Sequence, residues 1–438
     1  MINSGISDIP RSSGKSESDK TILLAGASVR YAAESARRAG MRCVAGDLFG
    51  DWDTELSSQI AIQVSNWGPD EIGSLVRNAR REGVCNLVIC GGMEKRVGLL
   101  RELDQHFPIV GSSADAVEKT NDPFFLQKVV QGFGKTRQAE QVGFPRTKSG
   151  FDATMRGADW LMKPEESAGG HQVAHFDPSS AKPVDDCHFL QERIIGESYS
   201  SVFFANAGEV RLIGSTRQLV GSEPFVSPFR PFAYCGSIGP IEHSRDQVEI
   251  LIHVATELIR ESGLAGVFGV DWVLGADGKI WIIEVNPRIT SSCEIFELAG
   301  QVDSVVGMQC GIRASSHQPC HADILYGKAS VYSQCDVVRQ VSRELFDWFV
   351  ANRMDNSRDL NAADGFIGCA DIPNCDSQIA PGAPVTTLFA KSRVDRNARV
   401  GGNRQAIDEV HETLVDAAKR LHLRMKKLGT AVSSAVPS

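Results

Sequence analysis

Short apolar runs alternate with an amphipathic stretch in the first hundred residues of the chain. Residues Thr21–Ser28 (TILLAGAS) predict a strand that ends at a glycine turn, Arg30–Ala39 predict a helix, and Met41–Ala45 predict a second strand. Two further apolar runs, Asn86–Cys90 and Ile109–Val110, predict strands of the same kind. Because strand, helix and strand in succession begin a parallel α/β unit, we expect about four parallel strands, doubly wound.

The middle of the chain changes to a pattern of helices with clear ends and of strands joined by short turns. Phe124–Phe133 predicts a helix with Asp122 as its N-cap and Pro123 at its first position, where the missing N–H costs nothing. Gln247–Ser262 predicts an amphipathic helix that ends at a glycine. Between these helices we expect a mainly antiparallel set of strands and one long loop: Trp160–Pro164, Phe189–Ile195, Ser200–Asn206, Glu209–Gly214, Gln218–Val220 and the loop Ser222–Gly239.

The stretch Gly266–Thr290 contains two apolar runs joined by an Asp-Gly turn, which predicts a hairpin. A loop of two or four residues would place Asp271 on the same face as Glu284 and Asn286, since side chains alternate along a strand. Carboxylate and amide oxygens gathered in this way suit Mg²⁺ held together with a substrate phosphate. The alternative is a solvated hairpin with ordinary polar side chains. The position of Glu284 and Asn286 inside an otherwise apolar run favours the metal site.

Lys163 lies on a predicted strand that is followed by the pair Gly169 and Gly170. A lysine supplies a point charge and a glycine loop lets the backbone approach closely, so this pattern can hold a polyphosphate. A surface hairpin with one solvated lysine would look the same, and the pattern alone leaves both interpretations open.

The last third of the chain is β-rich and closes with a helix at Asn403–Lys427. A cluster of His317, Cys320 and His321 has ligand types for a metal but no fourth partner, so we give it no metal. The expected division is residues 1–20 as a disordered tail, 21–120 as an N-terminal α/β domain, 121–300 as a central domain, 301–428 as a β-rich segment and helix that complete the core, and 429–438 as a second tail.

Composition excludes several classes of partner. The 438 residues carry a net charge of −8, so a nucleic-acid backbone or an anionic membrane is not expected as the main partner. The longest apolar runs fall short of the roughly 18 residues of a membrane span. The 11 cysteines contain no CxxC pair, which favours reduced thiols and a cytoplasmic location.

Along the chain these signals follow one order: a lysine on a strand, a glycine loop, a Gln-Glu segment, an Asp, and then Glu-x-Asn. In this order of motifs the sequence resembles the ATP-grasp superfamily. The segments GVDWVL and EVNPR are similar to those of the biotin-carboxylase-related carboligase (carboxylate-amine ligase) branch. SVRYAAESARRAGMRCVAGDLFGDWD resembles the N-terminal domain of that branch, and ADIPNCDSQIAPGAPVTTLFA resembles its C-terminal segment. The resemblance implies an α/β and α+β protein. Its doubly wound parallel N-terminal domain would be followed by an ATP-grasp fold of two α+β lobes, with a small β-rich C-terminal segment and a closing helix.

The resemblance implies the following phosphate contacts. Lys163 would contact the α- and β-phosphates, and the loop through Gly169 and Gly170 would close over the triphosphate. Arg288 would lie near the γ-phosphate and the acyl phosphate, with Arg217 as a weaker candidate for the same anion.

The resemblance also implies contacts to the base, the ribose and the metal. They are Gln191, Glu192 and Ile194 for the adenine hinge, Ser198 or Glu197 for the ribose, and Asp271, Glu284 and Asn286 for the metal. One departure concerns an earlier lysine that many members carry just after an aspartate. This chain has Asp122-Pro123 there, and Lys128 and Lys119 are the nearest alternatives.

The function implied is an ATP-dependent ligase that activates a carboxylate as an acyl phosphate before an amine attacks it. Its cofactors would be ATP and one or two Mg²⁺ (or Mn²⁺), its substrates small molecules, and its assembly a possible homodimer. Amino-acid ligation in cofactor biosynthesis is one context. An ATP-binding module without turnover is the alternative that the missing lysine favours. An NAD-linked dehydrogenase is disfavoured because Gly26, Ser28 and Tyr31 do not fit the G-x-G-x-x-G spacing.

Overall fold

The computed structural model describes residues 21–133, 140–151, 155, 159–166, 168–177, 184–185, 187–226, 230–312, 323–354, 364–395 and 402–431. The expected N-terminal tail and the cluster of His317, Cys320 and His321 lie outside these residues. No helix in the described part of the chain is both long and apolar enough to cross a membrane.

The N-terminal segment forms a four-stranded parallel sheet, which confirms the predicted number and direction of strands. Its strand order is β3-β2-β1-β4. Helices cover both faces, because alternate side chains of β1 enter two separate cores, one containing Ile22 and the other Leu23. The strands are β1 (Thr21–Ala25), β2 (Arg42–Asp47), β3 (Ile60–Gln63) and β4 (Val84–Ile89).

One strand of this sheet differs from the prediction. Ile109, expected in a strand of its own, makes only an isolated parallel bridge to Leu87. The remaining strand is instead β3, whose four residues are only half-buried or exposed and so give a weak apolar signal.

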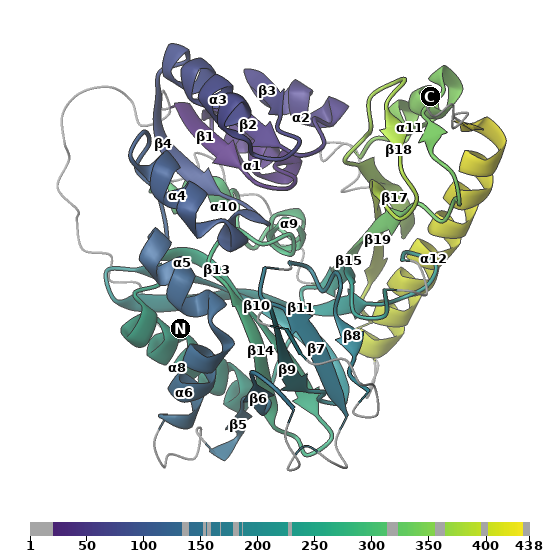
Figure 1. Ribbon diagram of the computed structural model, residues 1–438. Coiled ribbons are helices and arrows are strands. Elements are labelled where there is room, and N and C mark those ends of the chain that lie inside the picture. Colours follow the sequence, from purple (N-terminus) through teal and green to yellow (C-terminus); the bar gives the residue numbers. More distant parts are fainter. Residues whose placement is uncertain are drawn as a thin grey trace.

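A nine-stranded sheet forms the centre of the molecule, in the order β17-β19-β15-β12-β11-β10-β13-β14-β5. Figure 1 shows this sheet below the N-terminal one, with the long helix α12 (Gly402–Leu428) along one side. All its pairings are antiparallel except that of β14 with β5. Its strands are β5 (Val142–Gly143), β10 (Gly196–Asn206), β11 (Glu209–Val220), β12 (Tyr234–Gly239), β13 (Gly266–Gly275), β14 (Ile280–Asn286), β15 (Ile324–Tyr332), β17 (Gly365–Ala370) and β19 (Pro384–Arg393).

The stretch Ser222–Gly239 corrects a prediction, because its end is not a loop. Tyr234–Gly239 is the central strand β12, which joins the C-terminal strand β15 to the rest of the sheet. The strand has the sequence YCGSIG, in which two glycines and two polar residues interrupt the apolar run that would predict a strand. Gly236 is needed there, since a Cβ at this position would lie 2.2 Å from the Lys328 carbonyl oxygen.

Two smaller sheets complete the fold. The sheet β6-β9-β7-β8 forms a separate lobe, and β18-β16-β20 lies at the C-terminal end. Their strands are β6 (Thr147–Lys148), β7 (Trp160–Pro164), β8 (Ala174–His175), β9 (His188–Glu192), β16 (Arg339–Gln340), β18 (Gln378–Ile379) and β20 (Thr430–Ala431).

The two helix ends that were predicted from capping signals are confirmed. The Asp122 carboxylate accepts a hydrogen bond from the Phe124 N–H at 2.8 Å, with Pro123 at the first position of α6. Gly263 ends α8 with a left-handed φ of 82°. The helices not yet bounded are α1 (Arg30–Arg38), α2 (Trp52–Ser57), α3 (Pro69–Arg81), η2 (Met93–Lys95), α4 (Val97–Asp104), α5 (Ala114–Asn121), α6 (Pro123–Gln131), α8 (Arg245–Ser262), α9 (Cys293–Leu298), α10 (Val305–Gln309) and α11 (Arg343–Ala351).

Buried polar contacts join the N-terminal sheet to the C-terminal strands. Asp53, on α2, is fully buried, and its carboxylate accepts hydrogen bonds from the N–H groups of Asp371 and Ile372, both at 2.9 Å. Burial raises the pKa of Asp53 to about 7, against the nearby charge of Arg30.

Replacing Asp53 with alanine is expected to lower the free energy of unfolding by about 2–4 kcal/mol, because two buried N–H groups lose their acceptor. Urea unfolding at neutral pH measures this change. Asp53→Asn keeps one acceptor oxygen and should lose less, while Asp70→Ala in the exposed first turn of α3 is the matched control. Equal midpoints for Asp53→Ala and wild type would show that the junction does not depend on this carboxylate.

Candidate active site

The hairpin β13–β14 brings Asp271, Glu284 and Asn286 together through a β-bulge. Near the turn, Leu274 pairs with Ile280, so five residues separate the pairing positions and Asp271 would face Ile283. The register shifts between Asp271 and Trp272, which leaves Ile283 as the extra residue and pairs Asp271 with Glu284. The expectation from a loop of two or four residues therefore places Asp271 and Glu284 on one face correctly, but it is the bulge and not the loop length that pairs them.

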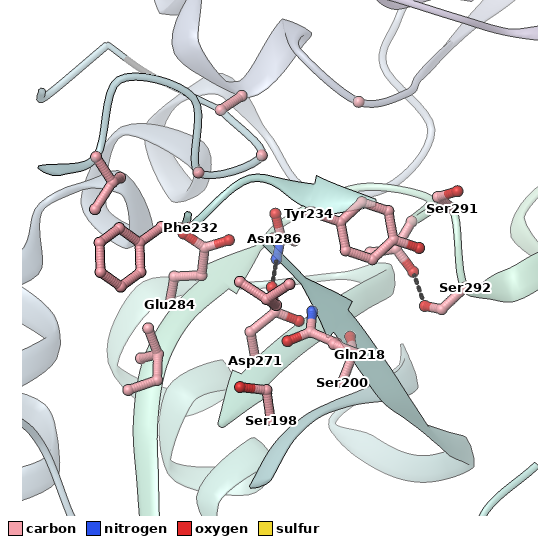
Figure 2. Close-up of a pocket in the computed structure, with 18 of the residues that line it drawn as sticks. Ser198, Ser200, Gln218, Phe232, Tyr234, Asp271, Glu284, Asn286, Ser291 and Ser292 are labelled. Carbon is pink, nitrogen blue, oxygen red and sulfur yellow. Dashed lines mark hydrogen bonds between the residues drawn. The ribbon is translucent and has the colours of Figure 1, made fainter. Parts of the chain in front are cut away.

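The three side chains form a connected group of oxygen atoms. The Asn286 amide Nδ2 donates to Asp271 Oδ2 at 3.1 Å, as Figure 2 shows. Asp271 Oδ1 is buried and has no hydrogen-bond partner. Burial raises the pKa of Asp271 to about 7, and the neighbouring Glu284 adds to the rise. Burial also acts against the charged form of Glu284, but Lys163 and other neighbouring groups bring the pKa of Glu284 below its usual value.

The predicted strand Trp160–Pro164 is confirmed as β7, and it carries Lys163 toward the same group. Lys163 Nζ donates to Gln191 Oε1, on the neighbouring strand β9, at 2.8 Å. Burial lowers the pKa of Lys163, while the charges of Glu284 and Asp271 oppose this change. The lysine and the acids thus face each other from two different sheets.

The glycine loop lies against the beginning of the central strand β12. The Tyr234 N–H donates to the Gly169 carbonyl at 2.8 Å, and both Gly169 and Gly170 have positive φ angles of 65° and 71°. A Cβ on Gly170 would lie 1.9 Å from the Phe232 carbonyl oxygen, whereas a Cβ on Gly169 would meet only His171, at 3.6 Å. Gly170 is therefore required for the close approach, and Gly169 only for its φ.

Gly170→Ala is expected to weaken nucleotide binding by about tenfold to a hundredfold, because the loop must move from the strand edge as well as bear strain. Gly169→Ala carries the strain alone and is its matched control, with an expected loss below about tenfold. Titration of each purified variant with MgATP measures the difference. Equal losses would mean that the contact with Phe232 does not set the position of the loop.

One cavity of about 650 Å³ unites most of the predicted residues. It is a suitable size for a nucleotide, since ligand pockets run from about 300 to 1,000 Å³. The predicted residues that line it are Lys163, Gly169, Gly170, Gln191, Glu192, Ile194, Ser198, Asp271, Glu284, Asn286 and Arg288. Figure 2 shows Ser198, Ser200 and Gln218 beside Asp271 on this wall.

Glu197 and Arg217 are placed differently from the expectation. Ser198, Gln218 and Asp271 occupy the cavity side of the sheet, so the alternation of side chains puts Glu197 and Arg217 on its other side. The two lie 4.0 Å apart there and do not line the cavity. The sheet separates Arg217 from the anion position that the resemblance implied, and leaves Ser198 rather than Glu197 facing the cavity.

The lysines weighed as replacements for the missing early lysine also lie outside the cavity lining. Lys128 and Lys119 are exposed on α6 and α5. Lys95, in η2 after β4, does line the cavity, and its charge acts on both Lys163 and Glu284. Sequence reasoning missed Lys95. The available signal was its position after the carboxyl end of a parallel strand, where ligands of open α/β sheets bind.

Arg288 connects the hairpin to the N-terminal segment. Its Nη2 donates to Asn286 Oδ1 at 3.0 Å and to Glu94 Oε1 at 2.8 Å. Although burial alone would lower it, the pKa of Arg288 lies above its usual value because of the Glu94 carboxylate. Glu94, which is 3% exposed and also lines the cavity, was not predicted either.

These residues fit Mg²⁺ and a triphosphate. Asp271 Oδ1 lacks a partner and Glu284 opens into the cavity, so two carboxylates and the Asn286 carbonyl can offer oxygen ligands. The described part of the chain has no cluster of three or more His, Cys, Asp or Glu side chains suited to a metal. A site with only two carboxylates and an amide matches a cation that shares its coordination with phosphates and water.

Comparisons with known proteins agree with this geometry. Residues 134–292 match a family model described as ATP-grasp domain. No curated protein sequence matches the chain significantly.

Solved structures with the same fold cover nearly the whole chain. The biotin carboxylase domain of 2-oxoglutarate carboxylase from Hydrogenobacter thermophilus, in complex with MgADP, ADP and bicarbonate, is 14% identical, with a TM-score of 0.60 over 89% of each chain. Carboxyaminoimidazole ribonucleotide synthase from Aspergillus clavatus, complexed with ATP, is 12% identical, with a TM-score of 0.61 over 91% of this chain and 100% of that one.

The L-amino acid ligase from Bacillus licheniformis is also 12% identical, with a TM-score of 0.60 over 89% of this chain and 98% of that one. At these identities the likeness is one of fold. Residues 134–292 match the ATP-grasp domain model and follow an N-terminal α/β segment, and the chain shares the fold of these ATP-grasp structures.

Proposed function

We propose that the protein is an ATP-dependent ligase that joins a carboxylate to an amine. The γ-phosphoryl of ATP is transferred to the carboxylate, the amine attacks the resulting acyl phosphate, and ADP and phosphate are released. The observation that carries this proposal is the meeting of Lys163, the glycine loop, the Asp271–Glu284–Asn286 group and Arg288 in one cavity.

Each of these residues has a role that phosphoryl transfer requires, since the reaction depends on positioning and charge neutralisation more than on covalent chemistry. Lys163 and Lys95 supply positive charge to the phosphates from the two sides of the cavity. Arg288 is held beside the carboxyl end of β14, where its charge can act on the transferring group. Mg²⁺, bound by Asp271, Glu284 and Asn286, would neutralise the phosphate oxygens.

The glycine loop serves to exclude water. An acyl phosphate that meets water before the amine is lost to hydrolysis, so the nucleotide end of the cavity must close. Gly169 and Gly170 already lie against β12, and their lack of side chains lets the backbone approach the phosphates.

The names of the relatives support a ligase over other uses of ATP, because they include a carboxylase, a synthase and an amino-acid ligase. Amino acids are therefore the first acyl donors to test. An ATP-binding module without turnover is the second candidate, favoured by Asp122-Pro123 and by the position of Lys128. Lys95 opposes it by bringing a cation into the cavity from the N-terminal segment.

ADP release with MgATP across a panel of carboxylates and amines tests the proposal. We expect release to be stimulated by a particular carboxylate and amine. ATP binding without stimulation by any pair would favour the module, and failure to bind ATP would contradict both candidates.

A further inference from the structure

The cavity continues beyond the nucleotide site to the N-terminal sheet. There it is lined by Ala27 and Ser28, which follow β1, and by Cys90, Gly91 and Glu94, which follow β4. In the order β3-β2-β1-β4 the chain runs from β1 outward through β2 to β3 and then crosses over to β4 on the other side of β1. Open α/β sheets bind ligands at such a switch point, outside the carboxyl ends of the strands. This end of the cavity is therefore placed to receive the second substrate.

The buried cations around this end already have carboxylate partners. Arg30 pairs with Asp371 at 3.0 Å and also with Glu294, and Lys328 Nζ donates to Glu294 at 2.5 Å. Arg288 is paired with Glu94. An anionic substrate group would have to displace one of these carboxylates or compete for Lys95, whose charge is assigned above to the ATP phosphates. This end therefore offers poor binding to a second phosphate or carboxylate.

One hydrogen-bond acceptor at this end, by contrast, is left over. Glu94 Oε1 is bound by Arg288, but Glu94 Oε2 is buried and has no hydrogen-bond partner. Leaving a buried carboxylate oxygen without a donor is costly. A second carboxylate at this end, Asp371, already accepts hydrogen bonds from Arg30 on both of its oxygens. The ligand that complements this surface is a hydrogen-bond donor with positive charge.

We propose that Glu94 is the residue that binds the amine substrate, through Oε2, and takes its proton during amide formation. This inference rests on the proposed ligase function. The amine nitrogen forms a bond to the acyl carbon, the bond from that carbon to the phosphate oxygen breaks, and phosphate leaves with the electron pair. A protonated amine first gives one proton to Glu94 Oε2, which frees the nitrogen lone pair for the attack. The departing phosphate takes the second proton, which the nitrogen loses once the new bond has formed. Since Arg288 holds the other oxygen of the same carboxylate, the amine is delivered beside the acyl phosphate.

A purely structural role is the competing explanation, in which Glu94 only fixes Arg288. The two roles of Glu94 can be distinguished, because they affect different steps. Loss of Arg288 positioning would slow phosphoryl transfer, whereas loss of a base would slow the attack of the amine. Glu94→Gln retains an amide oxygen that can accept from Arg288 and removes the negative charge.

The test uses the full chain, MgATP, the twenty common amino acids as acyl donors, and two nucleophiles. Hydroxylamine is largely unprotonated at neutral pH and traps an acyl phosphate without a base, whereas methylamine is protonated and needs one. For Glu94→Gln we expect hydroxamate formation within about threefold of wild type. N-methylamide formation should fall about 100-fold or more, the scale of general-base catalysis. Glu102→Gln, exposed on α4, is the matched control, and Glu94→Asp should recover part of the methylamine reaction.

Three outcomes would overturn the proposal. Parallel losses with both nucleophiles would show that Glu94 acts only by holding Arg288. Hydroxamate without N-methylamide in the wild type would show that the site does not accept a protonated amine. Absence of ADP release and of hydroxamate with every donor would remove the ligase function itself, and the proposal with it.

Discussion

Glu284→Ala is expected to lower kcat/KM for ADP release by about 10³-fold or more. Glu284 is the carboxylate that opens into the cavity, and Asp271, its partner across the bulge, has a pKa near 7 that disfavours its charged form. Removing Glu284 therefore takes away the negative charge most available to the metal. Loss of a metal ligand removes the charge neutralisation on which phosphoryl transfer depends.

Steady-state ADP release at increasing Mg²⁺ concentration measures this effect. Glu284→Gln should lose nearly as much as alanine, because an amide keeps the shape but not the charge. Glu197→Ala, on the other side of the same sheet, is the matched control and should keep wild-type kinetics. If Glu284→Ala and Glu197→Ala lost equal activity, the assignment of the metal to the bulged pair would be wrong.

Arg288→Met is the second large effect, with an expected fall in kcat of about 10²–10³-fold and a smaller change in the KM for ATP. The guanidinium is held by Asn286 and Glu94 at the boundary between the nucleotide site and the N-terminal sheet. A fixed positive charge at this place would act mainly on the charge that develops during transfer. A loss concentrated in kcat is the kinetic sign of such an interaction.

Arg217→Met tests two different expectations. The family resemblance offered Arg217 as a second contact to the transferring phosphate, whereas the structure places Arg217 away from the cavity. Because Arg217 lies on the side of the sheet away from Asp271, we expect its replacement to leave kcat unchanged. If Arg217→Met and Arg288→Met lowered kcat by similar factors, the assignment of the transferring phosphoryl group to the Asp271 side of the sheet would be contradicted.

Local patterns predicted most of the elements because their signals lie in neighbouring residues. The cap at Asp122, the stop at Gly263 and the strand that carries Lys163 are all confirmed. β12 was not predicted. Its glycines allow the neighbouring strand to approach closely, and this requirement leaves no apolar periodicity in the sequence. The bulge at Asp271 is likewise a product of pairing, which turn length alone does not determine.

The candidate site could be predicted only where its residues share one short segment. A single hairpin and the residues just after it contain Asp271, Glu284, Asn286 and Arg288. The alternation of side chains along its strands and the family resemblance could therefore predict these residues together. Glu94 and Lys95 reach the cavity from η2, nearly two hundred residues earlier in the chain. Their sequence context, GGMEK, shows no periodic signal. Arg217 and Glu197 lie outside the cavity lining, and the sequence could not show this because a motif position does not specify the face of the strand that carries it.

We propose that the cavity between the hairpin and the Lys163 strand is a metal-dependent ATP site. Calorimetric titration of the full chain with ATP, with and without Mg²⁺, tests it directly. We expect one site per chain whose affinity for ATP rises at least about tenfold with Mg²⁺, and we expect the Glu284→Ala variant to have lost this dependence. Binding that is equally tight without Mg²⁺, or unchanged in Glu284→Ala, would contradict it.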